Sequence, residues 1–270
     1  MQLTSKEIQL QFNGFLRTRN LWKNDAVFGL CQFEIGQESH EFDFEIDSKL
    51  RLGKYIERFV SFQLQQEKSI EIIAENIQIQ QEKRTLGELD CILKRNNKPI
   101  HLEIVYKFYL FDDAVGSTEI EHFIGPNRKD SLVEKLNKLK EKQLPLLYST
   151  ECKDFIKTLK LNIDEIKQQV YFKAQLFVPY SNQDLQLSEL NLDCIVGFYI
   201  YQKELDNFKT CKFYIPNKKD WLILPHQHIK WVDFLQFKID ATDYFEREFS
   251  PLIWIKNPNG TISKVFLVWW

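Results

Sequence analysis

Glycine and proline are scarce in this chain, with nine and eight occurrences in 270 residues. So little of either residue excludes a collagen-like segment and argues against a disordered tail. The apolar runs also fall far short of the roughly 20 residues that a membrane-spanning helix needs. The first seven residues, MQLTSKE, lack the apolar stretch of a signal peptide. We therefore expect a cytoplasmic protein that has no membrane partner.

The chain also lacks an excess of basic residues. It has 36 Lys and Arg residues against 38 Asp and Glu residues, and its net charge is −2. Proteins that bind a long nucleic acid through many phosphates usually carry a basic excess. The balance argues against a large non-specific DNA footprint, but it leaves a small basic groove or a short substrate open. The oligomeric state does not follow from the composition.

Cysteine is sparse and odd in number, and no two cysteines are close in sequence. The five are Cys31, Cys91, Cys152, Cys194 and Cys211. This spacing matches neither a disulfide framework nor a zinc site, so we expect reduced thiols in a reducing compartment.

Aromatic residues are plentiful, with 22 Phe, 10 Tyr and 6 Trp. Aromatic side chains bury large areas, so the interior should be well filled. The length permits one large core or a core with an elaboration.

The hydrophobic periodicity predicts an α/β protein. In chain order, it predicts a helix over 50–65, strands over 69–80, 86–93 and 100–110, a helix over 129–143, helical segments over 152–159 and 164–169, and a strand over 170–178. Short strands are expected at 26–35 and 41–46. The region 180–270 is expected to be mostly β, with strands at 193–201, 212–215, 252–256 and 263–269 and a turn at 257–260.

Two acidic residues, Asp90 and Glu103, lie on consecutive predicted strands joined by a turn at 96–98. Adjacent strands bring such carboxylates together, which is unfavourable unless a cation or a proton intervenes. Carboxylates suit Mg²⁺ or Mn²⁺, and a bound metal can polarise a phosphoryl oxygen and activate water. The alternative is a pair of surface-facing strand carboxylates.

Two further charged residues accompany this pair. Lys107 follows Glu103 on the same strand and face, where it could stabilise developing negative charge or simply be solvated. Glu57 lies on the edge of the apolar arc of helix 50–65, where it could assist the metal or merely border the arc.

Several motifs resemble a bacterial family of unknown function that is assigned by fold to the PD-(D/E)XK phosphodiesterase superfamily. They are Gly87-Glu88-Leu89-Asp90, the Glu103 and Lys107 of HLEIVYKFYL, Gly125-Pro126-Asn127 with Asp130, and Gln143-Leu144-Pro145-Leu146. The resemblance implies a restriction-endonuclease-like core of helix, three strands, helix and strand over 50–178. Residues 1–49 would then form an N-terminal elaboration, and 179–270 a β-rich aromatic C-terminal elaboration.

The resemblance also implies roles for individual residues. Asp90 and Glu103 would take the two acidic positions and Lys107 the lysine. Glu57 resembles a helical acid that would share the metal, and Gln143 a helical glutamine. One spacing differs from the superfamily, because E-x-K is replaced by E-x-x-x-K. At about 3.3 Å per residue, Lys107 lies about 13 Å along the strand from Glu103 rather than about 6.6 Å. Lys135 of the second helix is the alternative lysine.

These observations leave three hypotheses. The first is a Mg²⁺- or Mn²⁺-dependent phosphodiesterase acting on nucleic acid, with Asn127, Lys135 and Gln143 contacting the substrate. The second is a catalytically inactive module of the same fold that binds nucleic acid or a protein partner. In the third, the aromatic C-terminal region is the working part and the α/β core its scaffold.

Overall fold

The computed structural model describes residues 5–38 and 40–270, which form two compact units. The first unit contains 20–106 and 134–173, together with Ser5. The second contains 6–19, 107–133 and 174–270. Because these segments interleave along the chain, three consecutive domains at 1–49, 50–178 and 179–270 stay a prediction. Each unit is described by itself below.

The first unit contains strands in the order β1-β2-β3-β5. They are β1 (Ile70–Gln81), β2 (Arg84–Arg95), and the first parts of β3 (Lys98–Phe111) and β5 (Lys167–Pro179). β1, β2 and β3 form an antiparallel meander. Between β2 and β3, Asn96 and Asn97 have φ angles of 49° and 65°. Asparagine tolerates this left-handed region, so the expected turn is confirmed.

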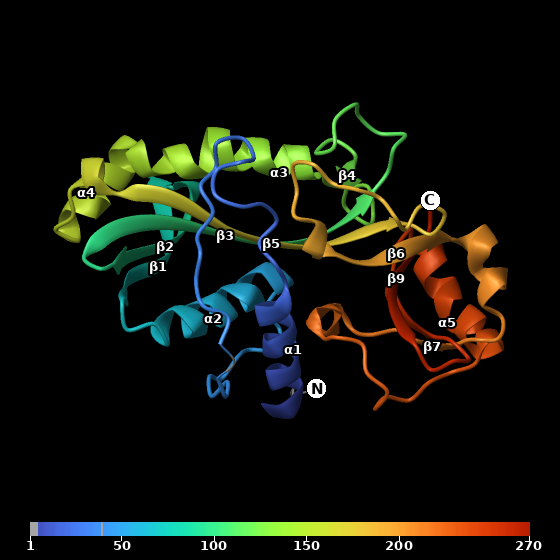
Figure 1. Cartoon of the computed structure of the whole chain (residues 1–270). Coiled ribbons are helices and arrows are strands. Elements are labelled where there is room, and N and C mark those ends of the chain that lie inside the picture. Colours follow the sequence, from blue (N-terminus) through green and yellow to red (C-terminus); the bar gives the residue numbers. More distant parts are fainter. Residues whose placement is uncertain (1–4, 39) are drawn as a thin grey trace. The chain divides into compact units, whose positions relative to one another are not determined.

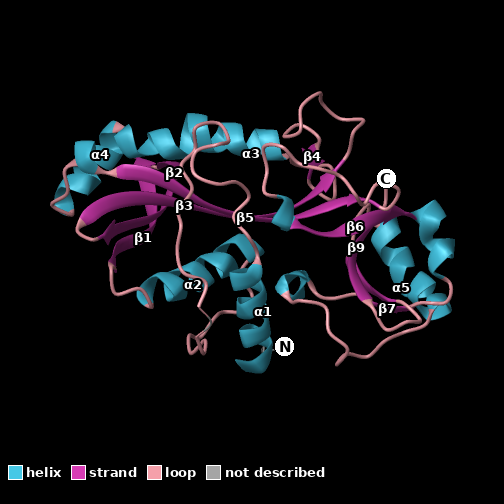
Figure 2. Cartoon of the chain, in the orientation of Figure 1, coloured by secondary structure: helices cyan, strands magenta, loops and turns pink. Residues whose placement is uncertain are grey.

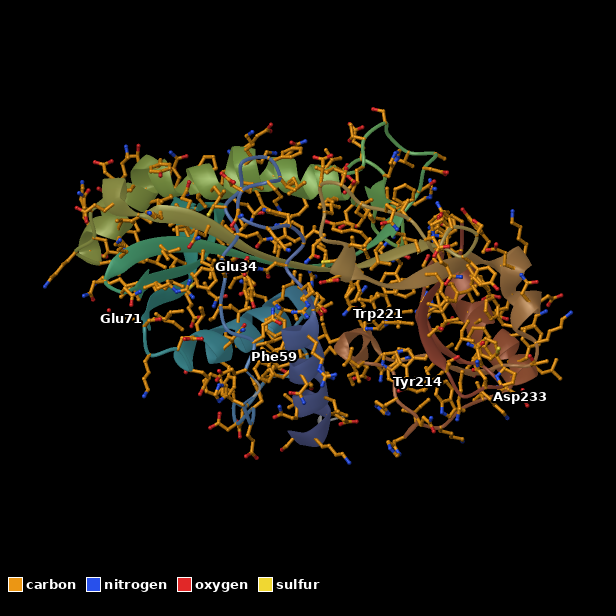
Figure 3. All side chains as sticks on the ribbon, viewed as in Figure 1. Glu34, Phe59, Glu71, Tyr214, Trp221 and Asp233 are labelled. Carbon is orange, nitrogen blue, oxygen red and sulfur yellow. The ribbon has the colours of Figure 1, made fainter. Side chains whose placement is uncertain are left out.

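Helices cover the meander on both faces, as Figures 1 and 2 show. One face carries α2 (Leu52–Gln65), and the other carries the helical run α3 (Leu132–Lys138), η1 (Leu139–Gln143), η2 (Leu144–Tyr148) and α4 (Thr150–Thr158). The predicted apolar arc of α2 is confirmed, because Tyr55 and Phe59 are fully buried. Of these two residues, Phe59 is labelled in Figure 3. On the other face, Leu89 and Ile79 pack against Leu147 of η2.

The helix expected over 129–143 begins at Leu132 and changes character before Gln143. Pro145 has no N–H and its ring crowds the preceding turn, so a regular α-helix cannot continue through it. The chain instead widens into the π-helical turn η1 and then tightens into the 3₁₀ turn η2. A change of helix type alters the direction in which side chains point. Gln143 is the last residue of η1, directly before η2.

The second unit combines a mixed sheet with two longer helices. Its strands follow the order β3-β5-β6-β9-β8-β7, with β4 paired to β3. The elements are α1 (Ser5–Arg17), β4 (Phe123–Ile124), β6 (Ile195–Tyr201), β7 (Lys212–Tyr214), α5 (Phe234–Glu246), β8 (Leu252–Lys256) and β9 (Ile262–Val268). β6 is parallel to β5 and β9, whereas β8 is antiparallel to β7 and β9. Short 3₁₀ turns include η4 (Leu192–Cys194), η5 (Gln202–Phe208) and η6 (Lys218–Leu222).

The mixed α/β class is confirmed, but three local expectations were wrong. The segments 26–35 and 41–46 form turns and extended chain, with one isolated bridge from Gln32 to Val170. Apolar residues such as Phe33 are buried by tertiary packing, and the contact of this stretch with Val170 of β5 is too short to form a strand. The helix expected over 164–169 is limited to η3 (Ile163–Glu165), because β5 begins at Lys167.

The region 180–270 is also less purely β than expected. It contains α5, which begins after Asp233, whose carboxylate accepts a hydrogen bond from the Gln236 N–H as a helix N-cap. The helix α1 was not anticipated either. Across residues 5–38 and 40–270, none of the helices combines the length and apolar character needed to span a bilayer.

Candidate functional site

A cluster of three carboxylates lies in the first unit, between α2 and β2. Glu57 comes from α2, and Glu88 and Asp90 come from β2. One oxygen from each lies within 4.8 Å of the others. All three side chains are partly buried, so solvent only partly screens their mutual repulsion.

Lys54 neutralises part of this cluster. It lies three residues before Glu57 on α2, and its ammonium donates to Glu57 Oε2 at 2.9 Å and to Glu88. A third bond reaches Asn76 Oδ1 of β1 at 2.8 Å. Burial alone would lower the pKa of Lys54, but its bonds to Glu88 and Glu57 raise it above the ordinary value. The protein thus places its own cation between two of the acids.

Asp90 lies near Glu103, because the charge of Glu103 acts on the Asp90 carboxyl. The antiparallel ladder runs from the Arg95–Lys98 pair to the Cys91–Leu102 pair. The paired register ends at Cys91 and Leu102, one residue short of Asp90 and Glu103. Asp90 Oδ2 accepts the Ile104 N–H at 2.8 Å. This hydrogen bond ties Asp90 to the residue that follows Glu103, whereas a shared metal-binding role for the two acids stays a prediction.

Burial raises the pKa of Asp90 to about 7, and the negative charge of Glu103 pushes it the same way. The bond from the Ile104 N–H opposes the shift without cancelling it. Burial likewise raises the pKa of Glu57, against the opposing bond from Lys54. A raised carboxylate pKa means that the negative charge at Asp90 is incompletely compensated by the protein.

Glu103 is fully buried and held at both oxygens. Gln143 Nε2 donates to Oε2 at 2.5 Å, and His101 Nε2 lies 3.0 Å from Oε1. The amide of Gln168 donates to His101 Nδ1 at 3.0 Å. Nδ1 therefore accepts, so the neutral tautomer of His101 carries its proton on Nε2 and donates it to Glu103. The carboxylate is oriented from two sides, yet each oxygen retains a lone pair.

Lys135 joins this network through Gln143. Its Nζ donates to Gln143 Oε1 at 2.7 Å, which fixes the amide so that its NH₂ group points to Glu103. The π-helical turn at 139–143 is what places Gln143 in this position. Of the two candidate lysines, Lys135 is thus connected to the acidic residues of the first unit.

A pocket of about 410 Å³ opens on this cluster. Its lining includes Glu57, Glu88 and Asp90 together with Gln143. Lys138 and Lys142 also line it, and both side chains are exposed. The pocket therefore combines acidic residues with exposed cationic side chains, a combination suited to a metal ion and a phosphate group.

Two predicted site residues, Lys107 and Asn127, belong to the second unit. The Lys107 ammonium pairs with Asp130 Oδ2 at 2.5 Å. The Asn127 side-chain oxygen accepts the Ser250 N–H at 2.7 Å. These contacts give both residues partners within their own unit, and their proposed roles toward a substrate stay predictions.

Three residues of the site escaped the sequence reasoning. Lys54 was not considered as a site residue, yet its ammonium donates to Glu57. His101 precedes Glu103 by two residues on a strand, a spacing that places both on one face, so this signal was present. Gln168 carried no local signal, because only the pairing of distant segments brings it to His101.

The fold and site define a mixed α/β protein with a pocket of paired carboxylates and lysines. Residues 30–268 match the family described as a domain of unknown function (DUF1853), and the chain belongs to that family. No curated protein and no solved structure matches the chain.

Proposed function

We propose that the protein is a divalent-metal-dependent phosphodiesterase acting on nucleic acid, built on a restriction-endonuclease-like core. The main support is Asp90, whose burial beside Glu103 raises its pKa to about 7 and leaves a site short of positive charge. The order α2, β1, β2, β3, helical run and β5 in the first unit agrees with such a core.

The donor set fits a hard cation. Asp90, Glu57 and Glu88 offer carboxylate oxygens within a small volume, and Mg²⁺ and Mn²⁺ prefer such oxygens. When bound, the metal would polarise the phosphoryl oxygen and lower the pKa of an attacking water. Glu103 completes the acidic site, with its orientation set by His101 and Gln143.

The lysines supply the complementary chemistry. Lys138 and Lys142 are exposed on the pocket wall, where they can contact the substrate phosphates. Lys135 acts through Gln143, so we assign it a positioning role for Glu103. Lys107 remains the second candidate for the superfamily lysine.

One observation favours the alternative of an inactive binding module. The Lys54 ammonium already bridges Glu57 and Glu88, which are two of the three clustered acids. If this lysine permanently replaces the metal, the lysines of the pocket would still bind phosphates without cleavage. Both functions would use the same pocket. The nuclease requires that Mn²⁺ displace the Lys54 ammonium from the acids, whereas the inactive module does not.

Cleavage of labelled single-stranded, duplex and branched DNA and RNA in the presence of Mn²⁺ tests the proposal. The wild type should cut at least one substrate, and Glu103→Gln should cut none at a measurable rate. Arg247→Gln is a matched control, because Arg247 is exposed in the second unit and pairs with Asp243. Wild-type binding without cleavage would instead support the inactive module.

A further inference from the structure

A second charged pocket lies wholly within the second unit. Its volume is about 340 Å³, and its walls come mainly from α1, β6, β9 and the segment that follows η6. Arg17 and Lys264 line it, and the described lining residues include no Asp or Glu. The charge of this pocket is therefore positive, opposite to that of the acidic cluster.

Lys264 is a buried cation without a counter-ion. Its side chain is almost completely enclosed. Nζ donates to Gln175 Oε1 at 2.8 Å and to the Trp221 carbonyl. Within residues 5–38 and 40–270, no carboxylate pairs with it. Burial accordingly lowers the pKa of Lys264 to about 7. Both acceptors are neutral, so the charge is solvated by dipoles alone, which is unfavourable in an interior.

A glycine of α1, Gly14, permits the close packing that surrounds Lys264. A Cβ on Gly14 of α1 would lie 2.0 Å from the Leu222 carbonyl oxygen. Glycine therefore allows η6 to approach α1 closely. Trp221, labelled in Figure 3, is then fixed by edge-to-face contacts with Phe108 and Phe266 at ring distances of 5.3 and 5.1 Å. The Trp221 carbonyl oxygen is thereby positioned to accept a hydrogen bond from the Lys264 ammonium.

The Lys264 ammonium has one more hydrogen-bond donor than the described residues supply acceptors for. A lysine ammonium has three N–H donors, and Gln175 and Trp221 accept two of them. The third has no acceptor among the described residues. The Arg17 side chain is exposed at the same pocket, and the described part of the chain provides it with no carboxylate partner. Two cationic groups thus share one pocket with free donors and no acid.

We propose that this pocket binds the oxyanion group of a small molecule, a carboxylate or a phosphate. The Lys264 ammonium donates its third N–H to the anion, and the Arg17 guanidinium closes over it from the rim. The anion then supplies the counter-ion that the fold itself omits. This site is separate from the acidic cluster, and it does not depend on the proposed nuclease function.

Calorimetric titration of the full chain with inorganic phosphate and, separately, with acetate tests this assignment, with ionic strength held constant by chloride. We expect saturable binding of at least one anion, and the two titrations distinguish phosphate from carboxylate. Arg17→Gln should weaken binding roughly 10- to 100-fold, because one charged hydrogen-bonding group is lost. Lys264→Met should abolish it, whereas Arg247→Gln should leave it unchanged.

Circular dichroism establishes that each variant is folded. If Lys264→Met does not fold, Arg17→Gln and the ¹³C resonance of the Lys264 Cε decide the matter, since this resonance should shift as phosphate saturates the wild type. Absence of saturable binding of both anions would overturn the proposal. So would unchanged binding in Arg17→Gln together with an unmoved Lys264 resonance.

Discussion

In the first unit, Asp90 is a partly buried carboxylate near Glu103, and its pKa is raised to about 7. In the second unit, Lys264 is a buried ammonium whose pKa is lowered to about 7. Burial is the leading cause of both shifts, with opposite sign. Each unit thus keeps an incompletely compensated charge, negative in the first and positive in the second. Such groups persist more readily where a ligand supplies the missing charge.

The largest expected effect separates the two candidate lysines. Lys135→Met should lower Mn²⁺-dependent cleavage by about 10²–10³, similar to the loss of one transition-state donor elsewhere, because Gln143 would no longer be held against Glu103. Lys107→Met should lower cleavage less than about tenfold, since its ammonium pairs with Asp130. Single-turnover rates on the best substrate measure both. If Lys107→Met abolished cleavage and Lys135→Met did not reduce it, Lys107 rather than Lys135 would be the lysine of the site.

The second prediction concerns the pH dependence of stability caused by Asp90. The folded protein holds the Asp90 proton more tightly than the unfolded chain, so the stability contribution is complete below pH 3.8 and is lost as pH rises toward 7. Asp90→Asn should flatten the decline in the free energy of unfolding between pH 4.5 and about 7.5. Denaturant titrations across this range measure it. Saturating Mn²⁺ should flatten the same decline in the wild type if Asp90 is a ligand.

Lys264 should produce a slope of the opposite sign at higher pH. Its folded pKa lies below its unfolded value of 10.5, so the unfolded chain binds more protons between pH 7 and 10.5. This group's penalty is full below about pH 7 and disappears as pH rises toward 10.5. The stability of the wild type should therefore gain from alkaline pH relative to Lys264→Met. Parallel curves for the two proteins between pH 7 and 9.5 would contradict the shift.

The smallest expected effect concerns Lys54. Lys54→Met removes the cation that bridges Glu57 and Glu88, so the metal-free protein should melt at a lower temperature and bind Mn²⁺ about tenfold more tightly, a change of about 1.4 kcal/mol. Thermal melting with and without Mn²⁺ measures both quantities. Arg51→Met, at the exposed N-cap of the same helix, is the control. Weaker Mn²⁺ binding in Lys54→Met would show that the lysine supports the metal rather than competing with it.

Much of the first unit was predictable from the sequence, because its signals are local. The helix at 50–65, the three strands and the turn at Asn96 and Asn97 follow from periodicity and turn chemistry. The pairing of β2 with β3, which brings Asp90 near Glu103, follows from a short hairpin whose register is set by its turn. Strong local patterns therefore identified the two central acids.

The tertiary structure alone decided what surrounds those acids. Gln143 reaches Glu103 because Pro145 forces a π-helical turn, and Gln168 reaches His101 across 67 residues of chain. In the second unit, Lys264 follows an ordinary strand pattern, and no local signal marks it as a buried cation. Its environment arises where Gly14, Trp221 and Gln175 converge from distant segments. Local sequence specifies the backbone and the pairing of neighbouring strands, whereas burial and compensation of a charge depend on residues that only folding brings together.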